Sequence, residues 1–355
     1  MDIFLIALII LCLWGVKFSA TGHTDYISRS QTDSIKGIFA IIILYSHMRG
    51  YFVSDVPYSS GYNVMLNYLG QLMVVMFLLY SGYGIMEALK RNRKKYMDTF
   101  LTHRVGKVWL MFAIAVGLFM LLNAILSIKH EPIKYLTSLI AWDSIGNSNW
   151  FVFDILVLYL LTYFALLISS KWGGVKYLVL AVYALTAALV IILWQSGKGM
   201  WWYDTILAYP TGMLYSIYKA KIEQMVRGWR WWLITFIIAA LFIFCRFKLY
   251  ILVDLLDNTF GYMLNFAVAV FASSIFAMLV LLLTMKIKLD NPALRWLGVN
   301  AFAIYILQRL AMILGQHFGW NKNAVLFACF VIPATLLISA IYTAGTNRLN
   351  RKLFR

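Results

Sequence analysis

The chain has 355 residues, of which 63% are hydrophobic and only 13% are charged. A soluble domain carries about 25% charged residues, so this composition excludes a soluble fold and predicts a polytopic membrane protein. The formal net charge of +17 would also suit a nucleic-acid-binding protein, but the placement of the charges makes such a partner unnecessary. Cys12, Cys245 and Cys329 all lie in apolar stretches, so we expect neither a disulfide framework nor a metal site.

The chain begins with an apolar segment over residues 3–20. A signal peptide has a basic start and a cleavage site of small residues. Here the start carries Asp2, and no Lys or Arg precedes Lys17. We therefore predict a retained N-terminal transmembrane helix, which forms a unit with its linker over residues 1–29.

Apolar windows of about 20 residues predict an all-α transmembrane bundle of about 11 helices. The segments are 3–20, 34–53, 64–88, 107–127, 150–170, 175–195, 201–218, 230–248, 261–285, 295–316 and 324–344. The connections are short, so we expect one membrane core of about ten helices over residues 30–345. A basic tail over residues 346–355 follows it.

The number of Lys and Arg residues alternates between high and low in successive connections. One set of connections holds 23 of them and comprises 17–36, 90–107, 171–176, 219–230, 286–295 and 348–355. The opposite set holds 7 and comprises 49–63, 128–149, 196–200, 246–260 and 317–323. By the positive-inside rule, this predicts a multi-pass protein of the cell (plasma or inner) membrane with its N-terminus outside and its C-terminus cytoplasmic. Anionic membrane lipid is the partner that the basic surface would meet.

The second segment carries a cation near its start and a histidine well inside it. Lys36 and His47 are 11 residues apart, so on an α-helix they fall on one stripe, about 16 Å apart along the axis. The predicted orientation puts Lys36 at the cytoplasmic mouth and His47 in the outer half. A neutral imidazole can act as a general base, although a hydrogen bond between helices would also explain a histidine here.

Other polar residues lie inside predicted helices, where they are costly and point to function. Asp154 lies at a depth similar to that of His47, and it could orient the imidazole, bind an acceptor hydroxyl or be a solvated carboxylate. Gln308 and Arg309 diverge by about 100° on a helix, so they need not share a role. Arg309 suits a buried structural partner or a substrate contact. Ser81 lies among small residues that allow close helix packing.

A second set of residues, Lys36, Arg104 and Lys107, lies at the predicted cytoplasmic edge. Arg104 and Lys107 are three residues apart, which puts them on one face of an α-helix. Clustered cations suit phosphate groups. Anchoring at the membrane surface is the alternative explanation.

Together these residues resemble the acyltransferase-3 family of integral membrane acyltransferases, which includes polysaccharide O-acetyltransferases. The similarity spans about residues 30–345. It is carried by Asp33-Ser-Ile-Lys36-Gly37 with His47, Leu79-Tyr80-Ser81-Gly82-Tyr83, Arg104-Val-Gly-Lys107, Trp150-Phe151-Val152 with Asp154, and Gly298-Val-Asn300-Ala-Phe-Ala-Ile-Tyr305-Ile-Leu-Gln308.

Three positions depart from the family pattern. Lys36 and Lys107 stand where the family has arginine, and lysine keeps the charge but loses the bidentate geometry. Gln308 stands where the family often has histidine. Because glutamine does not titrate, any role of Gln308 is hydrogen bonding rather than proton transfer.

The resemblance implies transfer of an acyl group, most simply acetyl from cytoplasmic acetyl-CoA, to a hydroxyl of an extracytoplasmic or cell-surface polysaccharide. His47 would be the general base, with Asp154 orienting it or the sugar. Lys36, Arg104 and Lys107 would hold the CoA phosphates. Candidates for substrate contact or oxyanion stabilisation are Ser81, Trp150, Gln308 and Arg309.

A competing hypothesis is a transporter or flippase of a lipid-linked glycan, in which the polar residues line a path and do no acyl-transfer chemistry. Broken helices in paired repeats would favour it, and the sequence predicts none. A purely structural or sensory protein would leave His47 and Arg309 freely replaceable.

Overall fold

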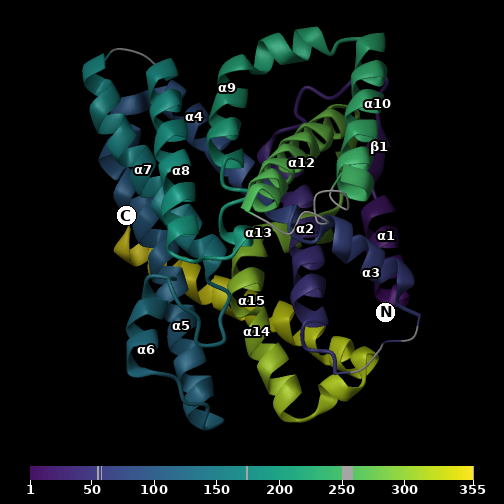
Figure 1. Cartoon of the computed structure of the whole chain (residues 1–355), viewed down its shortest axis with the longest axis vertical. Helices are drawn as coiled ribbons and strands as arrows, with labels where there is room; N and C mark the ends of the chain where they lie inside the picture. The colour runs from purple at the N-terminus through teal and green to yellow at the C-terminus, as the bar shows by residue number, and fades with distance from the viewer. Residues whose placement is uncertain (54–55, 57, 173–174, 250–258, 355) are drawn as a thin grey trace.

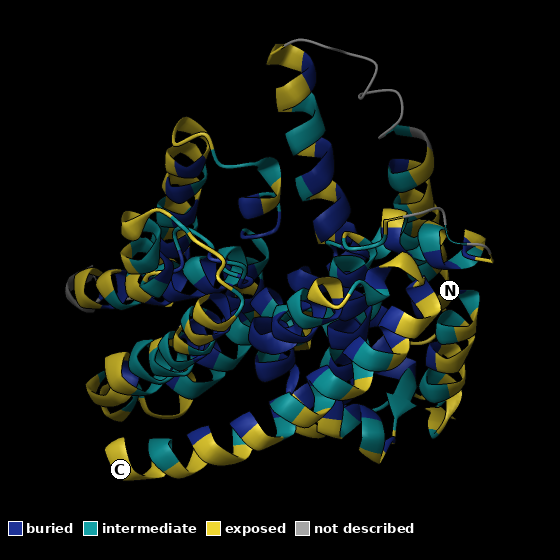
Figure 2. Ribbon diagram, turned by 90° about the horizontal axis from the view of Figure 1, so that it is seen from below, coloured by how far each residue is buried: buried dark blue, intermediate teal, exposed yellow. Residues whose placement is uncertain are grey.

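The structure is a computed structural model that describes residues 1–53, 56, 58–172, 175–249 and 259–354 (Figure 1). Parts of the predicted connections 49–63, 171–176, 246–260 and 348–355 lie outside the described residues. The fold confirms the predicted all-α bundle. Buried side chains gather in its centre, and exposed ones cover the outer helices (Figure 2).

The chain forms helices throughout its described length, with two short strands between them. In chain order they are α1 (Asp2–Leu13), β1 (Val16–Phe18), α2 (Arg29–Arg49), α3 (Ser60–Leu69), α4 (Met73–Phe100), α5 (Lys107–Ile125), α6 (Pro132–Leu139), α7 (Trp150–Trp172), α8 (Val175–Gln195), α9 (Ala208–Met225), α10 (Trp229–Phe244), α12 (Thr259–Lys286), β2 (Ile287–Leu289), α13 (Pro292–Val299), α14 (Ala301–His317) and α15 (Ala324–Leu353). A π-helical turn, Leu101–Gly106, joins α4 to α5, and another, Cys245–Leu249, follows α10.

Within the described part of the chain, six helical runs are long and apolar enough to cross a membrane, or seven if the bent pair α13–α14 counts as one span. This is fewer than the sequence predicted, for three reasons. The predicted segments 64–88 and 107–127 fall largely in one continuous run, Met73–Ile125. Helices α2 and α9 carry charged residues within their length, and α1 is short.

The N-terminal helix is shorter than the predicted segment 3–20. Helix α1 ends at Leu13, and its 12 residues rise only about 18 Å, against the ~30 Å of a hydrocarbon core. Gly15 has a positive φ of 76°, and Val16–Phe18 then pairs antiparallel with Ile287–Leu289. A strand partner distant in sequence therefore ends the helix.

The predicted segment 295–316 is broken. Helices α13 and α14 meet at an angle of 75°, because Asn300 leaves the helical conformation with φ −94° and ψ 2°. This bend was not predicted from the sequence, which indicated one straight segment here. Helix α2 lies near the middle of the bundle, and both arms of the elbow pack against it (Figure 1).

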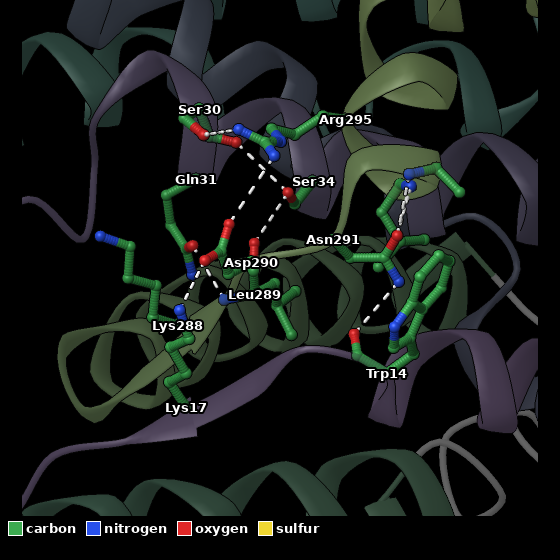
Figure 3. Close-up of polar contacts among 12 residues, drawn as sticks. Trp14, Lys17, Ser30, Gln31, Ser34, Lys288, Leu289, Asp290, Asn291 and Arg295 are labelled. Atoms are coloured by element: carbon green, nitrogen blue, oxygen red, sulfur yellow. Dashed lines mark hydrogen bonds and ion pairs between the residues drawn. The ribbon is translucent and has the colours of Figure 1, made fainter.

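Polar contacts fasten the first half of α2 to the segment that follows α12 (Figure 3). Gln31 donates to the carbonyl of Ile287 at 3.1 Å and accepts from the N–H of Leu289 at 3.0 Å. Ser34 donates to the Leu289 carbonyl at 3.0 Å. Because Gln31 satisfies both a donor and an acceptor of the β2 backbone, α2 is fixed in register with it.

The same segment is tied to the N-terminal region. Asn291 donates to the carbonyls of Leu11 and Trp14 at the end of α1, at 2.8 and 3.1 Å. Lys17 lies 2.6 Å from Asp290, and its hydrogen bond holds the pKa of that carboxyl below its ordinary value. The pair is exposed, so its contribution to stability is small.

Glycines allow the backbones of α2 and α13 to touch. A Cβ atom on Gly37 would collide with the carbonyl of Leu294, and one on Gly298 would collide with the carbonyl of Asp33. Gly82 and Gly212 allow the same close backbone contact between α4 and α9. Gly82, two residues after Tyr80, therefore serves helix packing, as small residues do between membrane helices.

We predict that Gly37→Ala lowers the free energy of unfolding by about 1–3 kcal/mol, the usual cost of overpacking a tight contact. The measurement is the midpoint of thermal unfolding in detergent. Gly345→Ala, inside α15 with nothing within 4 Å of the new methyl group, is the matched control. Its midpoint should stay or rise, since alanine is the better helix former. Equal midpoints for the two variants would contradict the close contact.

Candidate functional site

Two cavities lie along α2. The first, which we call the Lys36 cavity, has a volume of about 840 Å³ and includes Lys36, Ser81 and Arg104 in its lining. The second, which we call the His47 cavity, has a volume of about 730 Å³ and includes His47, Trp150 and Arg309. Helix α2 is continuous from Arg29 to Arg49, so the predicted Lys36–His47 stripe connects the two cavities over about 16 Å.

A local side-chain cap marks the start of helix α2. The hydroxyl of Ser28 accepts from the backbone N–H of Gln31, which satisfies one of the free N–H groups at a helix start. The apolar residues that follow bury most of the helix. The helix stops at Arg49, four residues before the predicted end, which puts His47 in the last turn.

Positive side chains dominate the Lys36 cavity. Arg29, Lys36, Arg91, Lys95 and Arg104 line it, together with the single carboxylate of Glu87. Arg104 donates from Nε to the phenol oxygen of Tyr96 at 2.8 Å. Its remaining guanidinium nitrogens are suited to phosphate oxygens.

Lys36 is held rather than free. Its Nζ lies 2.6 Å from Oδ1 of Asp33, the first residue of the family-like motif, and its side chain is 26% exposed. The ammonium group carries three donors, so the ion pair orients it without using up its hydrogen-bonding capacity.

Lys107 does not lie with Lys36 and Arg104. It lines a different cavity beside the end of α15, and its Nζ lies 5.7 Å from the centre of the Phe354 ring. The prediction assumed an α-helical spacing between Arg104 and Lys107. The chain instead forms a π-helical turn over Leu101–Gly106, which has more residues per turn and separates the two side chains.

Gln308 is the residue that contacts His47. Its Nε2 lies 2.6 Å from Nδ1 of the imidazole and 3.2 Å from the carbonyl of Tyr305, while its Oε1 is buried without a hydrogen-bond partner in the described part of the chain. An amide nitrogen only donates, so Nδ1 accepts and the proton of the neutral ring is on Nε2. If the amide turned over, Oε1 would accept from Nδ1–H and Nε2 would become the free base.

Arg309 also reaches the histidine, on the neighbouring face of α14. It lines the His47 cavity and an adjoining cavity of about 440 Å³, and His47 and Trp150 line both as well. The predicted residues His47, Trp150, Gln308 and Arg309 therefore come together.

Asp154 and Ser81 lie elsewhere. Asp154 is fully buried, and among the described residues neither of its carboxylate oxygens has a hydrogen-bond partner. It lines neither cavity and makes no polar contact with His47. Ser81 forms a hydrogen bond of 2.8 Å with Tyr159 and belongs to the Lys36 cavity.

An apolar constriction separates the two cavities. Phe77 and Phe151 pack edge to face with ring centres 6.2 Å apart, and Phe151 packs in the same way on Tyr305 at 5.6 Å. A small cavity of about 50 Å³ lies among these three rings. Phe77 also lines the Lys36 cavity and Tyr305 lines the His47 cavity, so the constriction is continuous with both.

Several residues of the His47 cavity were missed from the sequence. Gln71 donates to Asp204 at 2.9 Å and to the carbonyl of Trp201 at 2.9 Å. Burial raises the pKa of Asp204 to about 7, although the Gln71 hydrogen bond and the charge of Arg246 oppose the shift. These residues come from separate connections, and no local pattern in the sequence links them to His47.

Comparison with known protein families gives a match over most of the chain. The model of the acyltransferase-3 family, described as an acyltransferase domain, matches residues 30–344. No curated protein and no solved structure matches the chain.

We predict that neutral His47 carries its proton on Nε2 in the resting protein, because Gln308 donates to Nδ1. The measurement is ¹⁵N NMR of histidine-labelled protein in detergent, with the His47 signals assigned by their loss in His47→Asn. Gln308→Leu removes the donor, and its His47 signals should shift toward a tautomer mixture. A wild-type signal showing a proton on Nδ1 would contradict this prediction, because it would mean that the Gln308 amide presents its oxygen to the ring.

Proposed function

The chain belongs to the acyltransferase-3 family, and on that premise we propose that this membrane acyltransferase moves acetyl from acetyl-CoA to a hydroxyl of an extracytoplasmic or cell-surface polysaccharide. One observation carries the proposal. A single helix, α2, presents a cationic cavity at one end and a histidine cavity at the other, with an apolar constriction between them.

The charge of the connections supports the direction of transfer. The connections rich in Lys and Arg, including 90–107 next to the Lys36 cavity, are the cytoplasmic ones by the positive-inside rule. The Lys36 cavity then opens toward cytoplasmic acetyl-CoA and the His47 cavity toward the outside. This orientation places the N-terminus outside and the C-terminus in the cytoplasm of a cell membrane.

In this proposal the cations of the Lys36 cavity hold the CoA phosphates. Lys36 and Arg104 keep the role that the sequence suggested, and Arg29, Arg91 and Lys95 join them as residues of the same cavity. Lys107 has no part in it. The pantetheine arm would extend along α2 through the constriction, where the side chains of Phe77 and Phe151 must move aside to admit it.

His47 acts as the general base when Gln308 presents its oxygen to Nδ1. Nε2 removes the proton of the acceptor hydroxyl while the oxygen attacks the thioester carbonyl carbon. Collapse of the tetrahedral intermediate breaks the carbon–sulfur bond, and the imidazolium returns its proton to the CoA thiolate. Trp150 and Arg309, which line the cavity with His47, contact the acceptor, and Asp154 takes no direct part.

We predict that His47→Ala lowers acetyl transfer by about 10²–10⁴-fold, the usual contribution of a positioned acid–base group. The assay follows label from acetyl-CoA into surface glycan in membrane vesicles. Binding of acetyl-CoA should remain, because His47 lies outside the Lys36 cavity. Retained transfer at normal expression would remove the base role, and glycan movement without thioester consumption would favour a flippase.

A second prediction concerns the donor site. Lys36→Ala and Arg104→Ala should each weaken acetyl-CoA binding about 10- to 100-fold, since hydrogen bonds to charged groups contribute about 1.5–3 kcal/mol. Titration calorimetry on purified protein measures the effect. Lys107→Ala removes the same charge from a neighbouring cavity and should bind as the wild type does. An equal loss in all three variants would point to general surface charge instead.

A further inference from the structure

The His47 cavity is richer in positive than in negative side chains. Of the residues that the structure describes, three arginines, Arg49, Arg246 and Arg309, line it together with the carboxylate of Asp204. Burial raises the pKa of that carboxyl to about 7. Among the described residues, the lining of this cavity therefore holds more cationic than anionic side chains.

Arg309 is the arginine next to the histidine. Its Nε is buried without a hydrogen-bond partner, and no carboxylate in the described part of the chain lies within ion-pair distance of it. The guanidinium lies beside the phenol of Tyr51, and its charge and hydrogen bond oppose the rise in the pKa of that phenol that burial causes. A phenol is neutral near pH 7, so it is no counter-ion.

Hydrogen bonds position the other two arginines. Arg49 donates to the side-chain oxygen of Asn67 at 2.7 Å. Arg246 donates to the backbone carbonyls of Tyr68 and Asn67, each at 3.1 Å. The Asn67 region thus fixes both guanidinium groups at the wall of one cavity.

Flat aromatic surfaces complete the cavity. Trp150 and Trp201 line it beside the arginines. Indole rings offer a large apolar face with few rotatable bonds, which suits the apolar face of a sugar ring. A few convergent polar groups among aromatic side chains are typical of a small-molecule site.

We propose that the His47 cavity binds an anionic glycan acceptor, with Arg309 contacting a carboxylate or phosphate of the sugar and Arg49 assisting. The proposal rests on the proposed function for calling this ligand the acceptor. A carboxylate would come from an acidic sugar, and a phosphate from a sugar phosphate or a lipid-linked glycan. Both present the oxygen pairs that a guanidinium binds in a bidentate manner.

The test measures binding of three probes to the purified full-length protein by tryptophan fluorescence. The probes are methyl β-glucuronide, glucose 1-phosphate and the neutral methyl β-glucoside, at constant ionic strength. At least one anionic probe should bind about tenfold or more tightly than the glucoside, as hydrogen bonds to a charged group imply. The tighter of the two anions identifies the carboxylate or the phosphate as the preferred group.

Variants place the effect at Arg309. Arg309→Gln should abolish the preference for the anion, Arg309→Lys should keep part of it, and Arg227→Gln, an exposed arginine outside the cavity, should keep all of it. Equal binding of the three probes, no binding of either anion, or an unchanged preference in a folded Arg309→Gln would overturn the proposal. Because these measurements need no acetyl-CoA, they stand or fall independently of acetyl transfer.

Discussion

The close contact between α2 and α13 is the constraint on which the site depends. Gly37 and Gly298 each lie against a backbone carbonyl of the other helix, so the two helices cannot slide or rotate without a collision. Helix α14 leaves α13 at the Asn300 elbow, and its course is therefore set by the same contact. The glycine contact near Lys36 therefore also determines where Gln308, about two turns along α14, meets His47.

The arrangement separates two kinds of chemistry that would interfere if they shared a cavity. Lys36 and Arg104 belong to a cavity rich in cations, which suits phosphates and tolerates water. His47 belongs to another, and the rings of Phe77 and Phe151 lie between them. An apolar constriction admits a thin, uncharged arm and opposes the passage of ions, because desolvating a charge is far more costly than moving an apolar group. In the proposed function, such a barrier would let the acyl group cross the membrane without opening a leak.

Much of the site could be predicted from local pattern, and the rest depended on geometry that the sequence does not show. The Lys36–His47 stripe follows from helical periodicity alone, and α2 is indeed one helix. Lys107 was misplaced because a π-helical turn changed the residue spacing. Helix α1 was drawn too long because a strand partner from the other end of the chain ends it. Arg246 and Asp204 reach His47 only through the fold.

In the proposed function, a glutamine at position 308 suits a base that must both take and return a proton. An amide offers a donor and an acceptor, so by turning over it can stay hydrogen-bonded to either tautomer of the imidazole. A carboxylate in that place would favour the imidazolium and hold the proton, and a leucine would leave the ring free to rotate. Oε1 of Gln308 has no hydrogen-bond partner in the described part of the chain. If the amide turned over, Oε1 would accept a hydrogen bond from Nδ1–H of His47. The turned-over amide would in exchange lose its hydrogen bond to the carbonyl of Tyr305.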